Sequence, residues 1–270
     1  GNSIFMPRAG FYNYDDFGES LQKPNHSLYY WTNTIYDSGS INAWDLVKNG
    51  LWNDNRIMYN TRRLGFPIRP VYDDRPPKRI GVFSVAADKQ VSFSQGNLQY
   101  TQSTDEWRFA REQYEYIGAA NIKDGALADK IDLFGWSSDS GKAPFGISTS
   151  QTAADYMGQF VDWGVNEIQG DAANTWRTLS QEEWNYIFEN RKNAKQLYSK
   201  GSIDGVRGMI VLPDDWVLPE GLHFTAAPDN LTMDLDINIY TRAQWQKMEE
   251  AGAVFLCPTG RRDGLNIGYL

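Results

Sequence analysis

The sequence predicts an α+β fold made of short antiparallel strands, two helices and long irregular loops. Short runs of β-branched and aromatic residues, each closed by a turn signal, indicate the strands. Two helix-start motifs indicate the helices. Strands and helices do not alternate strictly along the chain, which argues against a doubly wound parallel sheet. Residues 118–175 are rich in Gly, Ser and Asp, and a loop region of this length usually carries function.

The first strand is expected over residues 29–36, which are dense in aromatic and β-branched types. Residues 43–47 and 56–59 flank Asn49-Gly50, the strongest short-range signal for a β-hairpin. A strand over 65–71 contains two prolines, which lack a ladder donor, so it belongs at a sheet edge or beside a bulge. Further strands are expected at 80–85, 91–94, 98–100, 107–109 and 208–212.

Two capping boxes mark the helix starts. In the first, the Ser180 hydroxyl would accept a hydrogen bond from the amide of Glu183, whose side chain reaches back. Apolar residues at 184, 187 and 188 then give the helix one buried face. In the second, Thr241 and Gln244 take the same roles, and Gly252 is the expected left-handed terminator.

The composition is that of an acidic, aromatic-rich globular protein. Among 270 residues, 26 Lys and Arg face 34 Asp and Glu, and the net charge of −8 argues against nucleic-acid binding, which needs a cationic surface. The 10 Trp, 15 Tyr and 13 Phe supply ample apolar surface for a core. No apolar run approaches the roughly 18 residues of a transmembrane span. The single cysteine, Cys257, excludes internal disulfides and CxxC motifs.

The two ends of the chain resemble each other. The sequence IFMPRAG at 4–10 matches VFLCPTG at 254–260, so Gly10 and Gly260 are 250 residues apart (260 − 10). Each copy has the pattern of a short apolar strand that breaks at Pro and Gly. We therefore expect slightly more than one period of a 250-residue unit, cut within the unit.

Two adjacent prolines, Pro76 and Pro77, interrupt regular structure at a connection over residues 74–79. The predicted organisation is residues 1–73, the connection, and residues 80–270. The sequence leaves open whether the connection is an interdomain linker or a tight link between neighbouring strands.

Several motifs resemble one family. Three motifs in residues 29–73 resemble the C-terminal half of the Fibrobacter succinogenes major paralogous domain: YYWT at 29–32, AWDL at 43–46 and LGFPIRPV at 64–71. Three motifs in residues 90–188 resemble the front half of related exported repeats in Bacteroidetes: FSQGNLQY at 93–100, DLFGW at 132–136 and WRTL at 176–179. Two later motifs continue the pattern, VLPDDW at 211–216 and GAVFL at 252–256.

This family resembles the formylglycine-generating-enzyme branch of the C-type-lectin-like fold, in which the terminal strands pair and long loops form the ligand surface. The resemblance implies a C-type-lectin-like fold in permuted or split order. Residues 1–73 would be the C-terminal half of a lectin-like unit, and residues 80–270 its N-terminal and middle part. We expect the two parts to complete one core, within or between chains, because half a core would expose its hydrophobic sheet.

The sequence carries no recognisable catalytic motif. The enzymatic member of this fold uses paired cysteines, whereas Cys257 stands alone and is expected to be a buried core thiol. His26 and His223 have no recognisable partner, and no GxSxG, HExxH or phosphate-loop motif occurs. We therefore expect no enzymatic activity. A hydrolase that uses only carboxylates stays open as an alternative, with no particular pair favoured.

The best candidates for a ligand-binding surface are Trp52, Asn53, Asp54 and Arg56 on the predicted hairpin. Calcium-dependent lectins bind Ca²⁺ through a Glu-Pro-Asn and a Trp-Asn-Asp triplet, and residues 52–54 resemble the second. The first would be KPN at 23–25, where a lysine replaces the acid and repels the cation. We therefore expect no cofactor, with calcium kept as an alternative.

Other oxygen-rich or aromatic positions are expected to be structural. DLDIN at 234–238 lacks the Gly and the terminal Glu of an EF-hand and is expected to be a solvated strand edge. Aromatic rings can stack on sugars, but most of the tryptophans in or beside predicted loops are expected to lie in the core. The tryptophans in or beside predicted loops and hairpins are Trp31, Trp44, Trp52, Trp136 and Trp163.

These observations predict an exported, non-catalytic recognition or adhesion module at a bacterial cell surface or outer membrane, which binds a glycan or a protein. One alternative is a structural repeat of a surface assembly, in which half-repeats of different chains complement each other. The other alternative is the carboxylate-based hydrolase, which would need a deep acidic cleft with two facing carboxylates.

Overall fold

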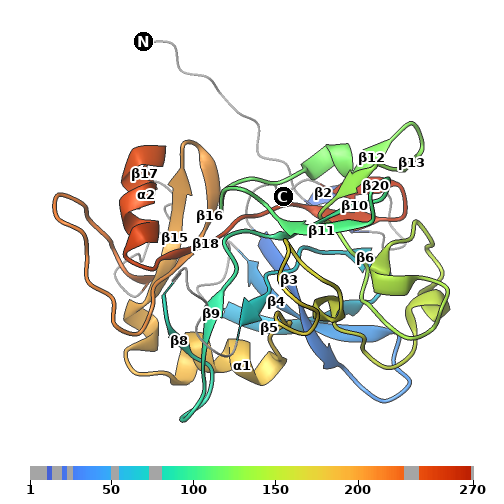
Figure 1. Cartoon of the computed structure of the whole chain (residues 1–270), viewed down its shortest axis with the longest axis horizontal. Coiled ribbons are helices and arrows are strands. Elements are labelled where there is room, and N and C mark those ends of the chain that lie inside the picture. The colour runs from blue at the N-terminus through green and yellow to red at the C-terminus, as the bar shows by residue number, and fades with distance from the viewer. Residues whose placement is uncertain are drawn as a thin grey trace.

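The computed structural model describes residues 11–13, 20–22, 27–49, 55–72, 81–227 and 237–268. They form a mixed α+β structure of small, mostly antiparallel sheets with two short α-helices (Figure 1). The α+β prediction is therefore confirmed. The described residues include no helix with the length and apolar character of a membrane span.

The secondary-structure elements are short. The α-helices are α1 (Gln181–Asn185) and α2 (Arg242–Glu250). The strands are β1 (Phe11–Asn13), β2 (Ser20–Gln22), β3 (Ser27–Ile35), β4 (Asn42–Asn49), β5 (Asn55–Thr61), β6 (Leu64–Gly65), β7 (Val71–Tyr72), β8 (Phe83–Ser84), β9 (Gln90–Phe93), β10 (Leu98–Thr101), β11 (Glu106–Phe109), β12 (Ile122–Lys123), β13 (Ala126–Leu127), β14 (Lys130–Ile131), β15 (Tyr198–Ile203), β16 (Val206–Val211), β17 (Ile239–Tyr240), β18 (Val254–Leu256), β19 (Arg261–Asp263) and β20 (Asn266–Gly268).

Strands β3, β4 and β5 form an antiparallel three-stranded sheet. The predicted hairpin is confirmed, because β4 pairs with β5 in a register that places Trp44 opposite Tyr59 and Leu46 opposite Ile57. Both strands are longer than the sequence pattern indicated. A register shift between Trp31 and Ile35 marks a bulge at the end of β3.

Residues 65–71 do not form the single strand that the sequence predicted. β6 ends at Gly65 and β7 begins at Val71, because Pro67 and Pro70 lack the amide donors that a ladder needs. The intervening carbonyls still find partners. The carbonyl oxygen of Ile68, for example, accepts the amide of residue 98 at 3.1 Å.

Segments on both sides of the 74–79 connection pair with each other. Arg262 of β19 lies opposite Gly65 of β6, and Phe93 of β9 lies opposite Val71 of β7. One hydrophobic cluster likewise contains residues from both sides: Tyr30, Leu46, Val71, Phe83, Val85, Val91, Phe93, Leu179, Trp184, Ile187, Phe188, Tyr198, Met209, Val211, Val254 and Leu256. The connection itself lies outside the described residues.

A buried polar network joins the same segments. Arg69 donates from Nη1 to the carbonyl oxygen of Phe255 at 3.2 Å and from Nη2 to Oε1 of Gln113 at 2.8 Å. Tyr30 donates to Oδ1 of Asn97 at 3.0 Å. Burial lowers the pKa of the Arg69 guanidinium to about 10. The arginine of the LGFPIRPV motif therefore has a structural role here.

The expectation for Cys257 is confirmed, because the residue is fully buried. Its thiol lies 3.7 Å from the carbonyl oxygen of Tyr114. Burial raises the pKa of the thiol, which keeps it protonated and unreactive.

One sheet, in the order β17-β15-β16-β18, carries α2; we call this unit the sheet region. β17 runs parallel to β15, whereas the other pairs are antiparallel. Helix α2 has the predicted capping box between Thr241 and Gln244, and it buries Trp245 and Met248.

Helix α1 also has its predicted capping box, between Ser180 and Glu183. It continues as a π-helical turn over Tyr186–Asn190, so that Trp184, Ile187 and Phe188 are all buried. The apolar face predicted for this helix is therefore confirmed, although the helix changes its hydrogen-bonding pattern halfway along.

Residues 110–178, which we call the loop region, contain short 3-10 turns and two-residue strands. In Figure 1 this region lies to the right and the sheet region to the left. Side chains connect the loops to β3: Trp31 Nε1 donates to the carbonyl oxygen of Phe134 at 3.1 Å, and Trp136 Nε1 donates to that of Thr32 at 3.2 Å. The DLFGW motif therefore fastens the loop region to the β3–β5 sheet.

Candidate functional site

The predicted site falls largely outside the described residues. Trp52, Asn53 and Asp54 lie outside them, and Arg56 lies in β5, where its backbone but not its side chain is described. The proposal of a hairpin site stays a prediction. No cluster of His, Cys, Asp and Glu side chains suited to a metal ion occurs among the residues that are described.

The expectation of a solvated strand edge over 234–238 is wrong at Asn238, and residues 234–236 lie outside the described residues. Asn238, expected on a solvated strand edge, is fully buried. Its amide donates to the carbonyl oxygens of Lys200 at 2.8 Å and Thr225 at 2.9 Å, and its Oδ1 accepts the amide of Thr225 at 2.8 Å. Buried polar groups must be hydrogen-bonded, and these three bonds let Asn238 connect β15 to the loop that contains Thr225.

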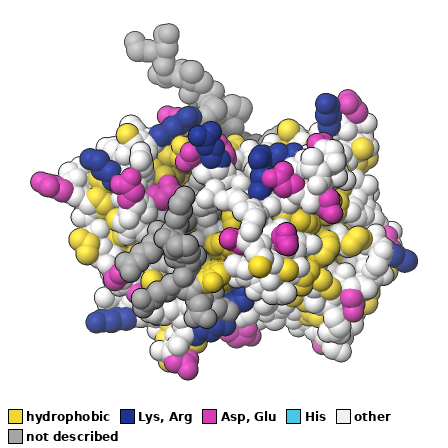
Figure 2. All heavy atoms as spheres, in the orientation of Figure 1, with side chains coloured by type: hydrophobic (Ala, Val, Ile, Leu, Met, Phe, Trp, Pro, Cys, Tyr) yellow, Lys and Arg dark blue, Asp and Glu magenta, His cyan; other side chains and the backbone are white. Residues whose placement is uncertain are grey.

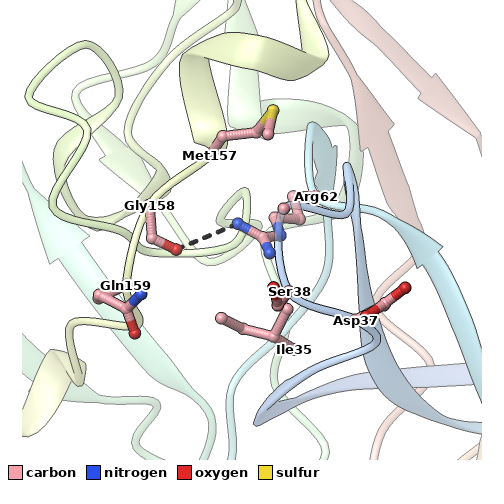
Figure 3. A pocket seen from close by; sticks show the side chains of 8 residues that line it. Ile35, Asp37, Ser38, Arg62, Met157, Gly158 and Gln159 are labelled. Atoms are coloured by element: carbon pink, nitrogen blue, oxygen red, sulfur yellow. Dashed lines mark hydrogen bonds between the residues drawn. The ribbon is translucent and has the colours of Figure 1, made fainter.

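The structure shows a cavity of about 390 Å³ at the end of the β3–β5 sheet opposite the predicted hairpin site (Figure 3). β4 spans Asn42–Asn49, so the two ends of the sheet are roughly 24 Å apart at about 3.4 Å per residue. The lining residues are Ile35, Asp37, Ser38, Gly39, Arg62, Met157, Gly158 and Gln159. We call this the arginine cavity.

Arg62 forms the charged wall of the arginine cavity, although the whole residue is only 1% exposed. Its Nε donates to the carbonyl oxygen of Asn42 at 3.3 Å. Its Nη1 donates to the carbonyl oxygens of Tyr156 at 3.4 Å and Gly158 at 3.2 Å. The guanidinium carbon lies 4.4 Å from the ring centroid of Trp136, a cation–π distance. These contacts fix the guanidinium in place.

No carboxylate pairs with Arg62 in the part of the chain that the structure describes, and its Nη2 makes no hydrogen bond there. Burial alone lowers the pKa of the guanidinium. Asp37 also lines the cavity, but it is exposed, and Figure 3 shows its carboxylate turned away from Arg62. Arg62 therefore has no counter-charge in direct contact, although the exposed Asp37 carboxylate stands elsewhere on the cavity wall.

Two turns with special backbone geometry shape the cavity. Gly39 has φ of +79° in the turn that follows β3, a conformation that favours glycine. At Gly158, which also has positive φ, a Cβ atom would lie 2.3 Å from Oδ1 of Asp139. The close approach of the two loops at this point places the Gly158 carbonyl oxygen against Arg62.

A second surface feature lies on the other face of the same strands. Tyr36, Trp44 and Tyr59 form a ring cluster, with centroid distances of 4.0 Å for Tyr36–Tyr59, 5.2 Å for Tyr36–Trp44 and 5.8 Å for Trp44–Tyr59. Tyr36 is 41% and Tyr59 47% exposed. Ile35 lines the arginine cavity and lies opposite Ala43 of β4, so the two side chains share a face of the sheet. Successive side chains of a strand point to opposite faces, so Trp44 of the ring cluster lies on the other side.

Most of the described tryptophans near predicted loops lie in the core, as expected, and Trp44 is the exception. Trp31, Trp136 and Trp163 are buried, which confirms their expected place in the core. Trp44 is half-buried and contributes to the ring cluster. Trp52 lies outside the described residues.

Charge on the surface is mixed. On the face shown in Figure 2, basic and acidic side chains are interspersed, with no patch of a single sign. His223 is exposed, and its Nε2 lies 3.0 Å from the carbonyl oxygen of Ile237. This contact connects His223 to the residues that precede β17.

Comparisons of the chain with protein-family models, with curated proteins and with solved structures find no match. The resemblance to the Fibrobacter succinogenes major paralogous domain and the C-type-lectin-like fold therefore rests on the sequence motifs and stays a prediction.

Sequence reasoning missed both surface features. Arg62 and Arg63 are adjacent and chemically identical, and only the fold places one against Trp136 and the other in an ion pair with Asp263. A signal for the ring cluster did exist, because Trp44 and Tyr59 fall on the two arms of the predicted hairpin. Their register, however, depends on the turn between them.

Proposed function

We propose that the protein is a non-catalytic recognition module that binds a glycan through the ring cluster of Tyr36, Trp44 and Tyr59. The observation that carries the proposal is that the exposed Tyr36 and Tyr59 and the half-buried Trp44 form one cluster of rings in mutual contact. Aromatic faces stack on the apolar faces of sugars, and a few nearby polar groups then fix the orientation of the ligand.

The geometry of the cluster favours binding because its rings are held in place. Trp44 and Tyr59 lie directly opposite each other in the β4–β5 ladder, and their rings meet edge to face with an interplanar angle of 89°. Tyr36 packs on Tyr59 at an interplanar angle of 37°. Side chains that are already ordered lose little conformational entropy when a ligand binds.

The cellular role in this proposal is adhesion by an exported protein at a bacterial surface. It is supported by the resemblance of the motifs at 93–100, 132–136 and 176–179 to the exported repeats in Bacteroidetes. The predicted hairpin residues Trp52, Asn53, Asp54 and Arg56 would form a second contact surface for a glycan or protein.

The test is a glycan-binding screen, with and without chelator, followed by calorimetry with Tyr59→Ala. Loss of one stacking ring should weaken binding between about twofold and tenfold, since ring contacts of this kind contribute about 0.5–1.5 kcal/mol. Tyr116→Ala is the matched control, because Tyr116 is also 47% exposed but lies outside the cluster. The proposal would be contradicted if no glycan binds in the screen, or if Tyr59→Ala and Tyr116→Ala weaken binding equally.

A structural repeat of a surface assembly is the second candidate, and one observation favours it. β1 pairs with β2, and β19 pairs with β20, so a hairpin follows each copy of the repeated sequence. β1 and β19 begin 250 residues apart (261 − 11), the same offset as the sequence match. Equivalent hairpins could exchange between chains, and this candidate predicts oligomers in light scattering. A strict monomer at all concentrations would remove it.

The carboxylate-based hydrolase receives no comparable support. It requires two facing carboxylates, and the arginine cavity contains one, Asp37. That alternative stays a prediction without an assigned pair.

A further inference from the structure

The geometry points to the arginine cavity as a separate binding site for the carboxylate of a sugar acid. The inference goes beyond the proposed ring-cluster function, because the cavity and the rings lie on opposite faces of the β3–β5 sheet. It rests on the charge of Arg62, on its free donors and on the chemistry of the cavity walls.

The Arg62 guanidinium has no carboxylate in direct contact among the described residues. A buried cation is costly unless it has a counter-charge or a full set of hydrogen bonds. Arg62 has three carbonyl acceptors and the face of Trp136, but no carboxylate partner in the described parts of the chain. Carbonyl dipoles offset a positive charge only in part, so an anion in the cavity would complete the compensation.

The free donors of Arg62 are on the part of the guanidinium that the loop carbonyls do not use. Nε and Nη1 of Arg62 are used by backbone carbonyls, whereas both N–H groups of Nη2 have no partner among the described residues. Figure 3 shows the guanidinium directed into the cavity, between the side of Ile35 and Ser38 and the side of Met157 to Gln159. A carboxylate oxygen placed there would accept a charge-assisted hydrogen bond.

The size and lining of the cavity suit a small ring-shaped ligand. Its volume of about 390 Å³ lies within the range of about 300–1,000 Å³ that is usual for small-molecule sites. Ile35 and Met157 provide apolar walls, and the exposed Ser38 and Gln159 provide a hydroxyl and an amide. The exposed Asp37 is the one carboxylate among the lining residues, and it is turned away from Arg62 (Figure 3), so it leaves the guanidinium open to a ligand. A bare carboxylate would leave most of this space empty, whereas a sugar ring would occupy it and use the polar groups.

The net charge of the chain selects the type of anion. At −8, the protein repels polyanions such as nucleic acids, and a single buried guanidinium is not a stripe of positive charge. One carboxylate on a small, otherwise neutral ring fits one guanidinium. The expected ligand is therefore a uronic-acid-type residue, free or at the end of a chain.

The binding test compares three probes on the full chain by calorimetry: glucuronate, glucose and acetate. Glucuronate should bind, and glucose should bind at least about tenfold more weakly, because it lacks the charge-assisted hydrogen bond. Acetate should bind more weakly than glucuronate, because it does not use the cavity walls. The arginine Nε–H resonance of Arg62 in an NMR spectrum should shift with glucuronate.

Charge variants at the cavity opening locate the site without disturbing Arg62, whose replacement would also free three carbonyls. Gln159 is exposed and lines the cavity, so Gln159→Glu should weaken glucuronate binding by about threefold or more, and Gln159→Lys should strengthen it by a similar factor. Gln196→Glu is the matched control, because Gln196 is exposed on a separate 3-10 turn and the variant changes net charge equally.

The outcomes are separable. Opposite effects of the two Gln159 variants, with no effect of Gln196→Glu, would support the site. Equal binding of glucuronate and glucose, no binding of glucuronate, or equal effects of Gln159→Glu and Gln196→Glu would overturn it. Circular dichroism of each variant shows whether the fold is retained, so a loss of binding can be assigned to charge.

Discussion

The sheet region and the loop region satisfy their buried backbone groups by different means. In the sheet region, β15 and β16 pair along their whole length and β18 extends the ladder. The interior there is correspondingly apolar, with Trp245, Met248 and Phe255 among its members. In the loop region, side chains bring the donors: indoles and buried guanidiniums bind main-chain carbonyls.

The difference follows from the geometry of the backbone. A ladder pairs its own N–H and C=O groups, so its side chains are free to be hydrophobic. Irregular backbone has no such pairing, and each buried carbonyl needs a donor from elsewhere. Arg262 illustrates this, since its guanidinium donates to the carbonyl oxygens of Leu133 at 3.2 Å, Ser148 at 2.6 Å and Gly146 at 3.3 Å.

The comparison also explains where the arginine cavity lies. Arg62, at the junction of the β3–β5 sheet and the loop region, binds loop carbonyls as Arg262 does, but two of its N–H groups stay free. In the proposed carboxylate site, these free donors would let a structural guanidinium also bind a ligand.

The largest effect is expected in the sheet region. Phe255→Ala should destabilise the protein by about 4 kcal/mol, because it removes a fully buried ring that packs against Trp245 at 5.5 Å and fills the space beside Gly208. Urea denaturation measures the change. Leu218→Ala, at a residue that is 41% exposed, is the control and should change stability by less than about 0.5 kcal/mol. A loss below about 1.5 kcal/mol for Phe255→Ala would contradict a large contribution of this buried ring to the free energy of unfolding.

A smaller and more local effect is expected in the loop region. Arg262→Met should cost about 3 to 4 kcal/mol, because several buried carbonyls lose their donors. Hydrogen exchange should show loss of protection in the loop region before the sheet region. Arg242→Met is the control, since Arg242 pairs with Asp204 at the surface, where such pairs contribute about 0–1 kcal/mol. Uniform loss of protection would contradict the division into two regions.

The smallest effect is a pH dependence in the loop region. Burial raises the pKa of Asp132 from 3.8 to about 6, against the hydrogen bonds from Asn121 and Ile117 that lower it. The folded state therefore binds more protons than the unfolded state between these values, so the contribution of Asp132 to stability is present at low pH and is lost as pH rises through about 6. The change is about 3 kcal/mol at most.

Denaturation of the wild type and Asp132→Asn between pH 4 and pH 8 tests this prediction. As pH rises through about 6, the unfolding free energy of the wild type should fall relative to that of Asp132→Asn, because Asp132 ionises and Asn does not. A difference that stays constant across this range would mean that Asp132 does not titrate there.

Local sequence patterns predicted the elements whose hydrogen bonds are local. The Ser180–Glu183 and Thr241–Gln244 boxes both form, because each needs only partners three residues apart. The β4–β5 hairpin forms for a similar reason. Asn238 shows the limit of this reasoning: an alternating polar pattern favoured an exposed edge, but the partners that bury it are at residues 200 and 225.

The sequence by itself determined the α+β class, the helix starts, the hairpin and the burial of most tryptophans, because these follow from spacing and hydrophobicity within a few residues. Only the tertiary structure decided that Arg62 is enclosed by loop carbonyls and Trp136 while Arg63 pairs with Asp263 at a half-exposed position. The physical reason is that the environment of a buried charge is set by groups far away in the chain, and identical side chains in adjacent positions can therefore have opposite roles.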